Sequence, residues 1–237
     1  MKTALLILAA AIVAPCADEG DLFSTAVGPV TITPVHDAEM TIQGAGRVIY
    51  VDPSGEGSHK GRAKADLVLI TTADADHFVP AVLARSGTKG AAIVGPAEIG
   101  AGLKRFTALE NGKTIQFGDI TIQAVPAYSP SPADAKTGRA QVRGNGYVLT
   151  YPGFRIYISG GTGLIPEMKA LKNIDVAFLA VGAPGTLSLE DAAAAIILIK
   201  PKIVYPYRYG QTSLDDIRKQ LGHAVPGVEV RVRDWYE

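Results

Sequence analysis

Cysteine is nearly absent from this chain of 237 residues, since Cys16 is the only one. A disulfide within the chain is therefore excluded, and a catalytic thiol could only be Cys16 itself. No G-x-S-x-G segment occurs, which removes the nucleophile elbow that many serine hydrolases use. We accordingly expect neither cysteine nor serine nucleophilic hydrolysis.

An excess of charge is also lacking, because 23 Lys and Arg residues balance 23 Asp and Glu residues. Such a chain has no general field that would gather nucleic acid or an anionic membrane, so no nucleic-acid partner is expected. No apolar run reaches the roughly 20 residues that a membrane-spanning helix needs, and we expect no transmembrane segment. Hydrophobic residues make up 47% of the chain, which is enough for a large core.

The first residues have the composition of a secretory signal peptide. A short basic start is followed by the apolar run ALLILAAAIV and by the small residues of APCA. We predict a signal peptide at residues 1–17, a single domain at residues 18–237 and a secreted or periplasmic protein. Lipoprotein anchoring at Cys16 is the alternative, which Pro15 directly before the cysteine disfavours.

The remaining chain contains two stretches in which antiparallel strands give way to alternating strands and helices. Alternation of apolar residues predicts half-buried strands, and continuous apolar runs predict strands that are buried on both faces. In the first stretch we predict strands at residues 28–35, 38–43, 47–53, 66–70 and 91–95, with helices at 79–87 and 96–106. In the second we predict strands at residues 113–118, 120–128, 146–159 (a hairpin), 174–181, 202–207 and 228–235, with helices at 165–171, 188–200 and 213–222. Ser188 with Asp191 and Ser213 with Asp216 have capping-box spacing, which predicts the starts of the last two helices.

This order of elements predicts the α/β class and, within it, a four-layer αβ/βα sandwich with two sheets face to face and helices outside. Strand ends from both sheets then meet at one edge, where we expect the site. The first loop at that edge, TTADADH, places acids beside His77. From spacing alone, the simpler interpretation is that the acids cap the next helix and His77 packs in the core.

Several short segments match one family in their order along nearly the whole chain. They are ITPVHDAEMTI, VIYVDPSGEG, KADLVLITTADADH, IQAVPAY, RGNGYVLT, RIYISGGT and IKPKIVYPYRYG. With these segments the chain resembles the metallo-β-lactamase superfamily, and in particular its ascorbate-6-phosphate lactonase-like branch of metal-dependent hydrolases. Agreement of many short strings in order is a stronger signal than any single motif.

The resemblance implies a metal loop, but this sequence departs from it. In the family the loop has the pattern H-x-H-x-D-H and holds one or two metal ions that activate water. The matching positions are Thr72, Asp74, Asp76 and His77, so two imidazoles are replaced. The hydroxyl of Thr72 is a weak zinc ligand, whereas Asp74 could still bind a harder metal.

Three further positions depart from the family. Gly161 stands where the resemblance implies a bridging aspartate, and Arg208 and Asp37 stand where it implies histidines. A guanidinium stays protonated and repels a metal ion. We therefore predict that Arg208 pairs with Asp76 or Asp74 and supplies the positive charge of the cleft. All seven of these positions are expected to line that cleft.

A retained scaffold with substituted ligands favours an exported, non-catalytic member of the fold that binds a small molecule or a protein partner, without a cofactor. On this hypothesis the catalytic residues are unknown. The alternative is a divergent metal-dependent hydrolase of an ester, a lactone or a phosphorylated small molecule. In that case Asp74, Asp76 and His77 would hold a divalent metal such as zinc, manganese or magnesium.

Overall fold

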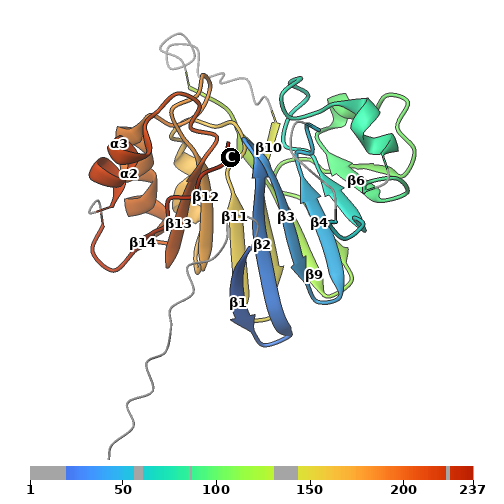
Figure 1. Cartoon of the computed structure of the whole chain (residues 1–237), viewed down its shortest axis with the longest axis horizontal. Helices are drawn as coiled ribbons and strands as arrows, with labels where there is room; N and C mark the ends of the chain where they lie inside the picture. The colour runs from blue at the N-terminus through green and yellow to red at the C-terminus, as the bar shows by residue number, and fades with distance from the viewer. Residues whose placement is uncertain (1–19, 56–60, 86, 131–143, 223–224, 237) are drawn as a thin grey trace, which may run out of the picture.

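Two seven-stranded sheets pack face to face in the computed structural model (Figure 1). The structure describes residues 20–55, 61–85, 87–130, 144–222 and 225–236. The predicted signal peptide lies outside these residues, so it and the secreted or periplasmic location that rests on it stay predictions. None of the helices in the described part of the chain is long and apolar enough to cross a membrane.

The first sheet contains strands β1 to β7 in sequence order. Its strands are β1 Asp21–Thr25, β2 Gly28–His36, β3 Glu39–Gly44, β4 Arg47–Val51, β5 Leu67–Leu69, β6 Ala92–Gly95 and β7 Phe106–Ala108. The first four strands are antiparallel neighbours, and β4 to β7 are parallel. This change of direction follows the predicted change from hairpins to alternating elements, because parallel neighbours need a crossover connection.

The second sheet has the order β14-β13-β12-β11-β10-β9-β8. Its strands are β8 Thr114–Phe117, β9 Ile120–Ala127, β10 Gly144–Tyr151, β11 Phe154–Ile158, β12 Val176–Ala180, β13 Ile203–Tyr207 and β14 Glu229–Val230. Strands β8 to β11 are antiparallel neighbours and β11 to β14 are parallel. The two sheets thus repeat one arrangement, and the four-layer αβ/βα sandwich predicted from the sequence is confirmed.

Two α-helices, α2 Leu189–Ile199 and α3 Leu214–Leu221, cover the outer face of the second sheet (Figure 1). Both have the predicted caps, since the hydroxyls of Ser188 and Ser213 accept hydrogen bonds from the backbone N–H groups three residues on. The three other predicted helices are only short 3-10 turns. These turns are η1 Pro80–Ala84, η2 Ala97–Gly100 and η3 Pro166–Ala170. Proline opens η1 and η3, where it is tolerated, and η2 ends at Gly100, a poor helix former.

Strand β5 shows why the site loop is rigidly placed. Leu67 and Leu69 point into the core between the sheets, whereas Val68 and Ile70 pack into a second cluster under η2. Both faces are therefore buried, as the continuous apolar run predicts. The loop that follows Ile70 leaves the sheet at the edge where the parallel strands of both sheets end.

Candidate functional site

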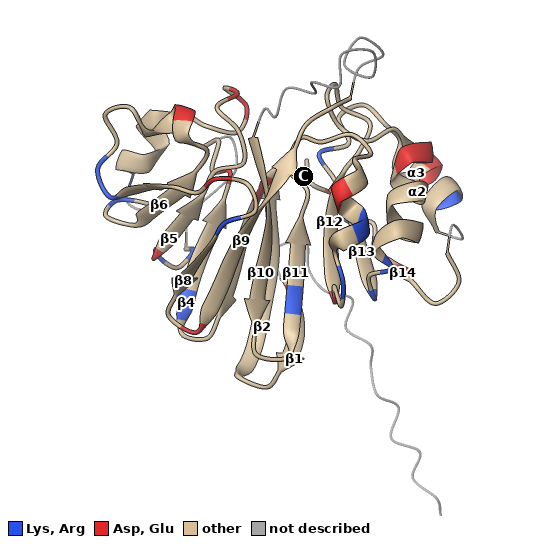
Figure 2. Ribbon diagram, turned by 180° about the vertical axis from the view of Figure 1, so that it is seen from behind, with Lys and Arg blue, Asp and Glu red and all other residues tan. Residues whose placement is uncertain are grey.

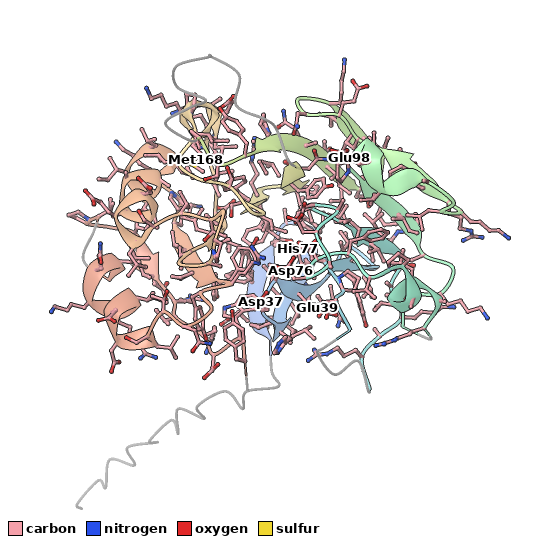
Figure 3. All side chains as sticks on the ribbon, turned by 90° about the horizontal axis from the view of Figure 1, so that it is seen from above. Asp37, Glu39, Asp76, His77, Glu98 and Met168 are labelled. Atoms are coloured by element: carbon pink, nitrogen blue, oxygen red, sulfur yellow. The ribbon has the colours of Figure 1, made fainter. Side chains whose placement is uncertain are left out.

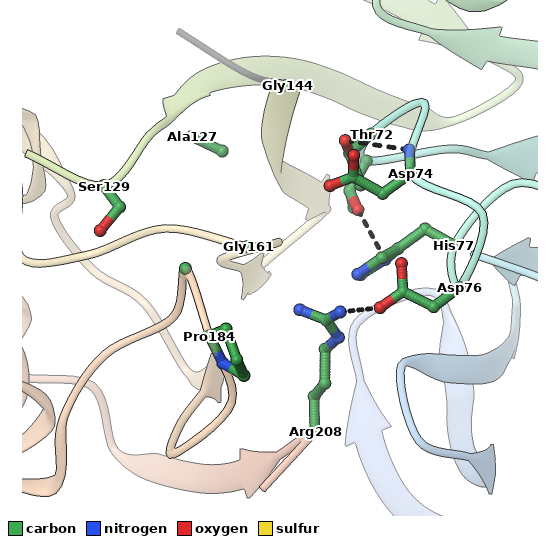
Figure 4. A pocket seen from close by; sticks show the side chains of 12 residues that line it. Thr72, Asp74, Asp76, His77, Ala127, Ser129, Gly144, Gly161, Pro184 and Arg208 are labelled. Atoms are coloured by element: carbon green, nitrogen blue, oxygen red, sulfur yellow. Dashed lines mark hydrogen bonds and ion pairs between the residues drawn. The ribbon is translucent and has the colours of Figure 1, made fainter. Parts of the chain in front are cut away.

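A pocket of about 390 Å³ lies at this edge, between the ends of the parallel strands of both sheets (Figure 4). Its walls include six of the seven positions predicted from the sequence: Thr72, Asp74, Asp76, His77, Gly161 and Arg208. Loops that the sequence interpretation did not single out contribute Thr71, Ala127, Ser129, Gly144, Pro184 and Gly185. The topology therefore gathers the predicted positions from three loops far apart in the sequence.

Beneath the pocket, the carboxylate of Asp52 binds two neighbours. Asp52 follows β4 directly and is fully buried. Its Oδ1 accepts a hydrogen bond from the backbone N–H of Thr71 at 2.7 Å, and its Oδ2 accepts one from the Thr71 hydroxyl at 2.6 Å. The same Oδ2 lies 2.7 Å from Nδ1 of His77. All three contacts are within the range of strong, charge-assisted hydrogen bonds.

Asp52 fixes the orientation of the His77 ring. Since Nδ1 donates to the carboxylate, a neutral ring keeps its lone pair on Nε2. Nε2 is buried, has no hydrogen-bond partner among the described residues, and belongs to a ring that borders the pocket (Figure 4). Burial lowers the pKa of His77, but the Asp52 carboxylate raises it by more, so the pKa lies above its ordinary value. The result is a proton acceptor or metal ligand without a partner.

Arg208 supplies a fixed positive charge on the opposite wall. Its Nη2 donates to Oδ2 of Asp76, and its Nε lies 3.5 Å from Oδ2 of Asp37. Partial burial raises the pKa of Asp76, but His77 and Arg208 together lower it below its ordinary value. The predicted pairing of Arg208 with Asp76 is present in the structure. Asp74 also borders the pocket, but no described residue pairs with its carboxylate.

Asp37 does not line the pocket but holds Arg208 from behind. Its backbone N–H donates to the carbonyl of Trp235, and its carboxylate accepts a hydrogen bond from the hydroxyl of Tyr236. Seen from above, Asp37, Asp76 and His77 lie in a row at the centre of the molecule, between its two halves (Figure 3). The C-terminal segment thus contributes to the position of the cation.

Three residues of this network have a left-handed backbone that only glycine adopts freely. The φ angles are +48° at Asp37, +44° at Asp52 and +53° at Arg208. Aspartate tolerates this region better than most residues, but for arginine the conformation costs on the order of 1–2 kcal/mol. Strained residues of this kind persist where the surrounding contacts determine them, as the two carboxylates do at Arg208.

At Gly144 and Gly160 the backbone lies too close to a neighbouring segment for any side chain. A Cβ on Gly144 would lie 2.2 Å from the carbonyl oxygen of Thr71, and one on Gly160 would lie 2.9 Å from that of Asn145. The backbone N–H of Asn145 in turn donates to Thr71. The GNG and SGG segments therefore hold β10 against the loop that carries His77.

The donor set of the pocket does not fit a metal ion by itself. Within the part of the chain that the structure describes, no group of three or more His, Cys, Asp or Glu side chains is placed to hold one. The carboxylate of Asp76 is already paired with the guanidinium of Arg208. Thr72 and Gly161 offer no strong metal ligand. Nε2 of His77 and the carboxylate of Asp74 are the remaining metal ligands among these residues. Two ligands are fewer than a zinc or magnesium site uses.

Sequence reasoning missed Asp52 and Thr71, although their positions contained a signal. Each follows a buried strand, β4 or β5, at the carboxyl edge of the parallel part of the sheet. A polar residue in such a place, next to the end of a neighbouring parallel strand, is expected to face the same edge.

The two sheets and the pocket at their common edge define an αβ/βα-sandwich protein. A family model described as a beta-lactamase superfamily domain matches residues 31–208. The chain belongs to the metallo-β-lactamase superfamily. The narrower resemblance to the ascorbate-6-phosphate lactonase-like branch stays a prediction.

Relatives and solved structures agree with this assignment. The chain is 31% identical over 192 residues to a UPF0173 metal-dependent hydrolase of Pelotomaculum thermopropionicum, a match that covers 75% of this chain and 83% of the relative. It is 32% identical to one of Thermus thermophilus, covering 73% and 80%. A crystal structure named as a metal-dependent hydrolase from Parabacteroides distasonis superposes with a TM-score of 0.80 at 36% identity, covering 92% of this chain and 99% of that one.

These names contradict two expectations from the sequence. An exported, non-catalytic binding protein was the favoured function, and no cofactor was expected, yet the relatives are named metal-dependent hydrolases. Both expectations were wrong for the same reason. They were inferred from the replaced positions of one motif, whereas the names of the relatives concern the family to which the whole chain belongs.

Replacing Asp52 with alanine is expected to destabilise the protein. The N–H and hydroxyl of Thr71 and Nδ1 of His77 would lose their acceptor inside the core, at a cost of about 3 kcal/mol of unfolding free energy. Urea unfolding followed by circular dichroism measures the change. Asp74→Ala is the matched control, because Asp74 is an exposed aspartate in the loop of Thr71 and His77, and its effect should stay within about 0.5 kcal/mol. Equal stability of the two variants would contradict the role given to Asp52.

Four substitutions should complete the ligand set that the resemblance implies: Thr72→His, Asp74→His, Gly161→Asp and Arg208→His. The backbone permits them, since Gly161 has no left-handed φ, its added Cβ would lie 3.9 Å from Arg208 Nη1, and histidine tolerates the conformation at position 208. We expect the variant to retain more zinc after dialysis than the native chain or Arg208→His alone. A folded variant with no gain would show that these positions do not converge on one ion.

Proposed function

We propose that this chain is a hydrolase that acts on a small molecule bound in the pocket, namely an ester, a lactone or a phosphorylated compound. The observation that carries the proposal is the buried Nε2 of His77, which has no hydrogen-bond partner among the described residues and belongs to a pocket-lining ring that Asp52 orients. Membership of a superfamily whose relatives are named hydrolases supports it. Those names also support a metal dependence for this chain.

His77 has the arrangement of a general base. A water molecule in the pocket can donate a hydrogen bond to Nε2, and the ring takes its proton as the water oxygen attacks the carbonyl or phosphoryl group. Asp52 keeps the Nδ1 proton in place and stabilises the imidazolium that forms. The proton then passes from Nε2 to the oxygen of the leaving group, which returns the ring to its neutral form.

Arg208 is placed to stabilise negative charge as it develops. Nη2 donates to Asp76 and Nε lies 3.5 Å from Asp37, so Nη1 is left on the side of Gly161, where the missing side chain leaves space. A guanidinium that is already oriented stabilises an oxyanion without further reorganisation. Its side chain is only 12% exposed, which limits screening by water.

A metal supplies a Lewis acid and a more acidic water in hydrolases that use one. The donors in the part of the chain that the structure describes do not form a complete metal site, and His77 and Arg208 act in these steps through their own side chains. The volume of about 390 Å³ suits a small substrate rather than a polymer held along its length.

The variant His77→Asn tests the base directly. The asparagine amide can still donate to Asp52 from near the position of Nδ1, but it offers nothing at the position of Nε2. We expect hydrolysis of p-nitrophenyl acetate, a γ-lactone or p-nitrophenyl phosphate to fall by about 10²-fold or more in kcat/KM. The thermal midpoint should stay close to that of the native chain, which separates catalysis from folding. Full activity in the folded variant would refute the role of His77.

Metal dependence is tested on the protein as purified without chelator. We expect activity to fall after dialysis against a chelator and to return with zinc, manganese or magnesium. The ion that restores activity should also raise the thermal midpoint. Activity that is unchanged in protein shown to be free of metal would contradict this dependence while leaving the hydrolase proposal in place.

A further inference from the structure

A second pocket, also of about 390 Å³, lies at the opposite edge of the first sheet, where the parallel strands β4 to β7 begin. Four basic side chains surround it: Arg47, Lys64, Lys89 and Arg105. Figure 2 shows basic positions gathered around this end of β4, β5 and β6. We infer that this pocket binds a small soluble anion whose phosphoryl groups carry more than one negative charge.

The two arginines are held in place before any ligand arrives. The guanidinium of Arg47 lies 3.9 Å from a carboxylate oxygen of Asp66 and stacks over the ring of Phe117 at 5.4 Å. Arg105 donates from Nη1 to the carbonyl of Gly90, across the pocket wall. Each guanidinium has further N–H groups that these contacts do not use. Oriented guanidinium groups are suited to the paired oxygens of a phosphoryl group.

The two lysines provide charge without internal partners. Lys64 and Lys89 are exposed, and neither amine pairs with an acid in the described part of the chain. Asp66 is the one acid among the residues that line this pocket, and its other oxygen accepts a hydrogen bond from the backbone of Val48. Four cations thus face one carboxylate, so repulsion among them favours uptake of an anion.

This concentration of charge is local, because the whole chain has a formal net charge of zero. At the other edge, acids outnumber basic groups, with Asp37, Asp52, Asp74 and Asp76 around His77 and Arg208. The excess of basic side chains around the second pocket is therefore not shared by the first. The electrostatic attraction to cations on several sides is strongest for a compact anion with several charges and weakest for a monovalent anion.

Inorganic pyrophosphate is the probe, titrated calorimetrically into the full chain at low ionic strength. We expect saturable binding at one site that weakens by about tenfold or more in Lys64→Gln/Lys89→Gln. The matched control is Lys113→Gln/Lys172→Gln, which removes the same charge from exposed positions away from the pocket and should bind like the native chain. Chloride at equal ionic strength should compete only weakly.

Three results would overturn the inference. One is no saturable binding by the native chain, and another is equal affinity in the two double variants. The third is a loss of binding in Arg208→Gln with none in Lys64→Gln/Lys89→Gln, which would place pyrophosphate in the pocket of His77. Co-sedimentation with phosphatidylglycerol vesicles separates the sources of phosphoryl groups. Vesicle binding without pyrophosphate binding would show a membrane surface instead of a soluble ligand.

Discussion

One buried carboxylate, that of Asp52, joins the parts on which the site depends. It follows β4, binds the backbone and hydroxyl of Thr71 after β5, and holds the ring of His77. An ionised carboxylate in a dry core is costly unless its oxygens are satisfied. Here three hydrogen-bond donors satisfy the carboxylate. The same three bonds fix two neighbouring strand ends and the imidazole of His77. The direction in which His77 Nε2 points is a consequence of this packing.

Charge balance extends that constraint across the pocket to the C-terminal segment. Arg208 lies between Asp76 and Asp37, and Asp37 is held by Trp235 and Tyr236, nearly 200 residues later in the chain. A partly buried guanidinium needs such partners because its proton cannot be lost. The contact between Asp37 and the C-terminal segment therefore helps to fix the position of the Arg208 guanidinium. This explains why a strained arginine backbone can persist there.

Much of the fold could be predicted from the sequence, because burial periodicity is a local signal. The two-faced burial of Leu67–Leu69 and the caps at Ser188 and Ser213 were predicted from such signals. The helices expected at residues 79–87, 96–106 and 165–171 were wrong, since each segment contains only a short 3-10 turn and local periodicity does not decide how far a helix continues. In the site, the pairing of Arg208 with Asp76 could be predicted from charge and the resemblance. The bond between Asp52 and His77 could not, because it depends on the alignment of β4 with the loop after β5.

The permanent charge of Arg208 also limits where a metal could enter. The relatives' names point to a metal, and His77 Nε2 with Asp74 offers two donors on one wall. A divalent ion beside a guanidinium would be repelled strongly at the low effective dielectric of a partly buried pocket. An ion on His77 must therefore either displace Arg208 from Asp76 or lie toward Asp74 and Thr72, at the first two positions of the motif. The guanidinium of Arg208 thus limits which part of the pocket an ion could occupy.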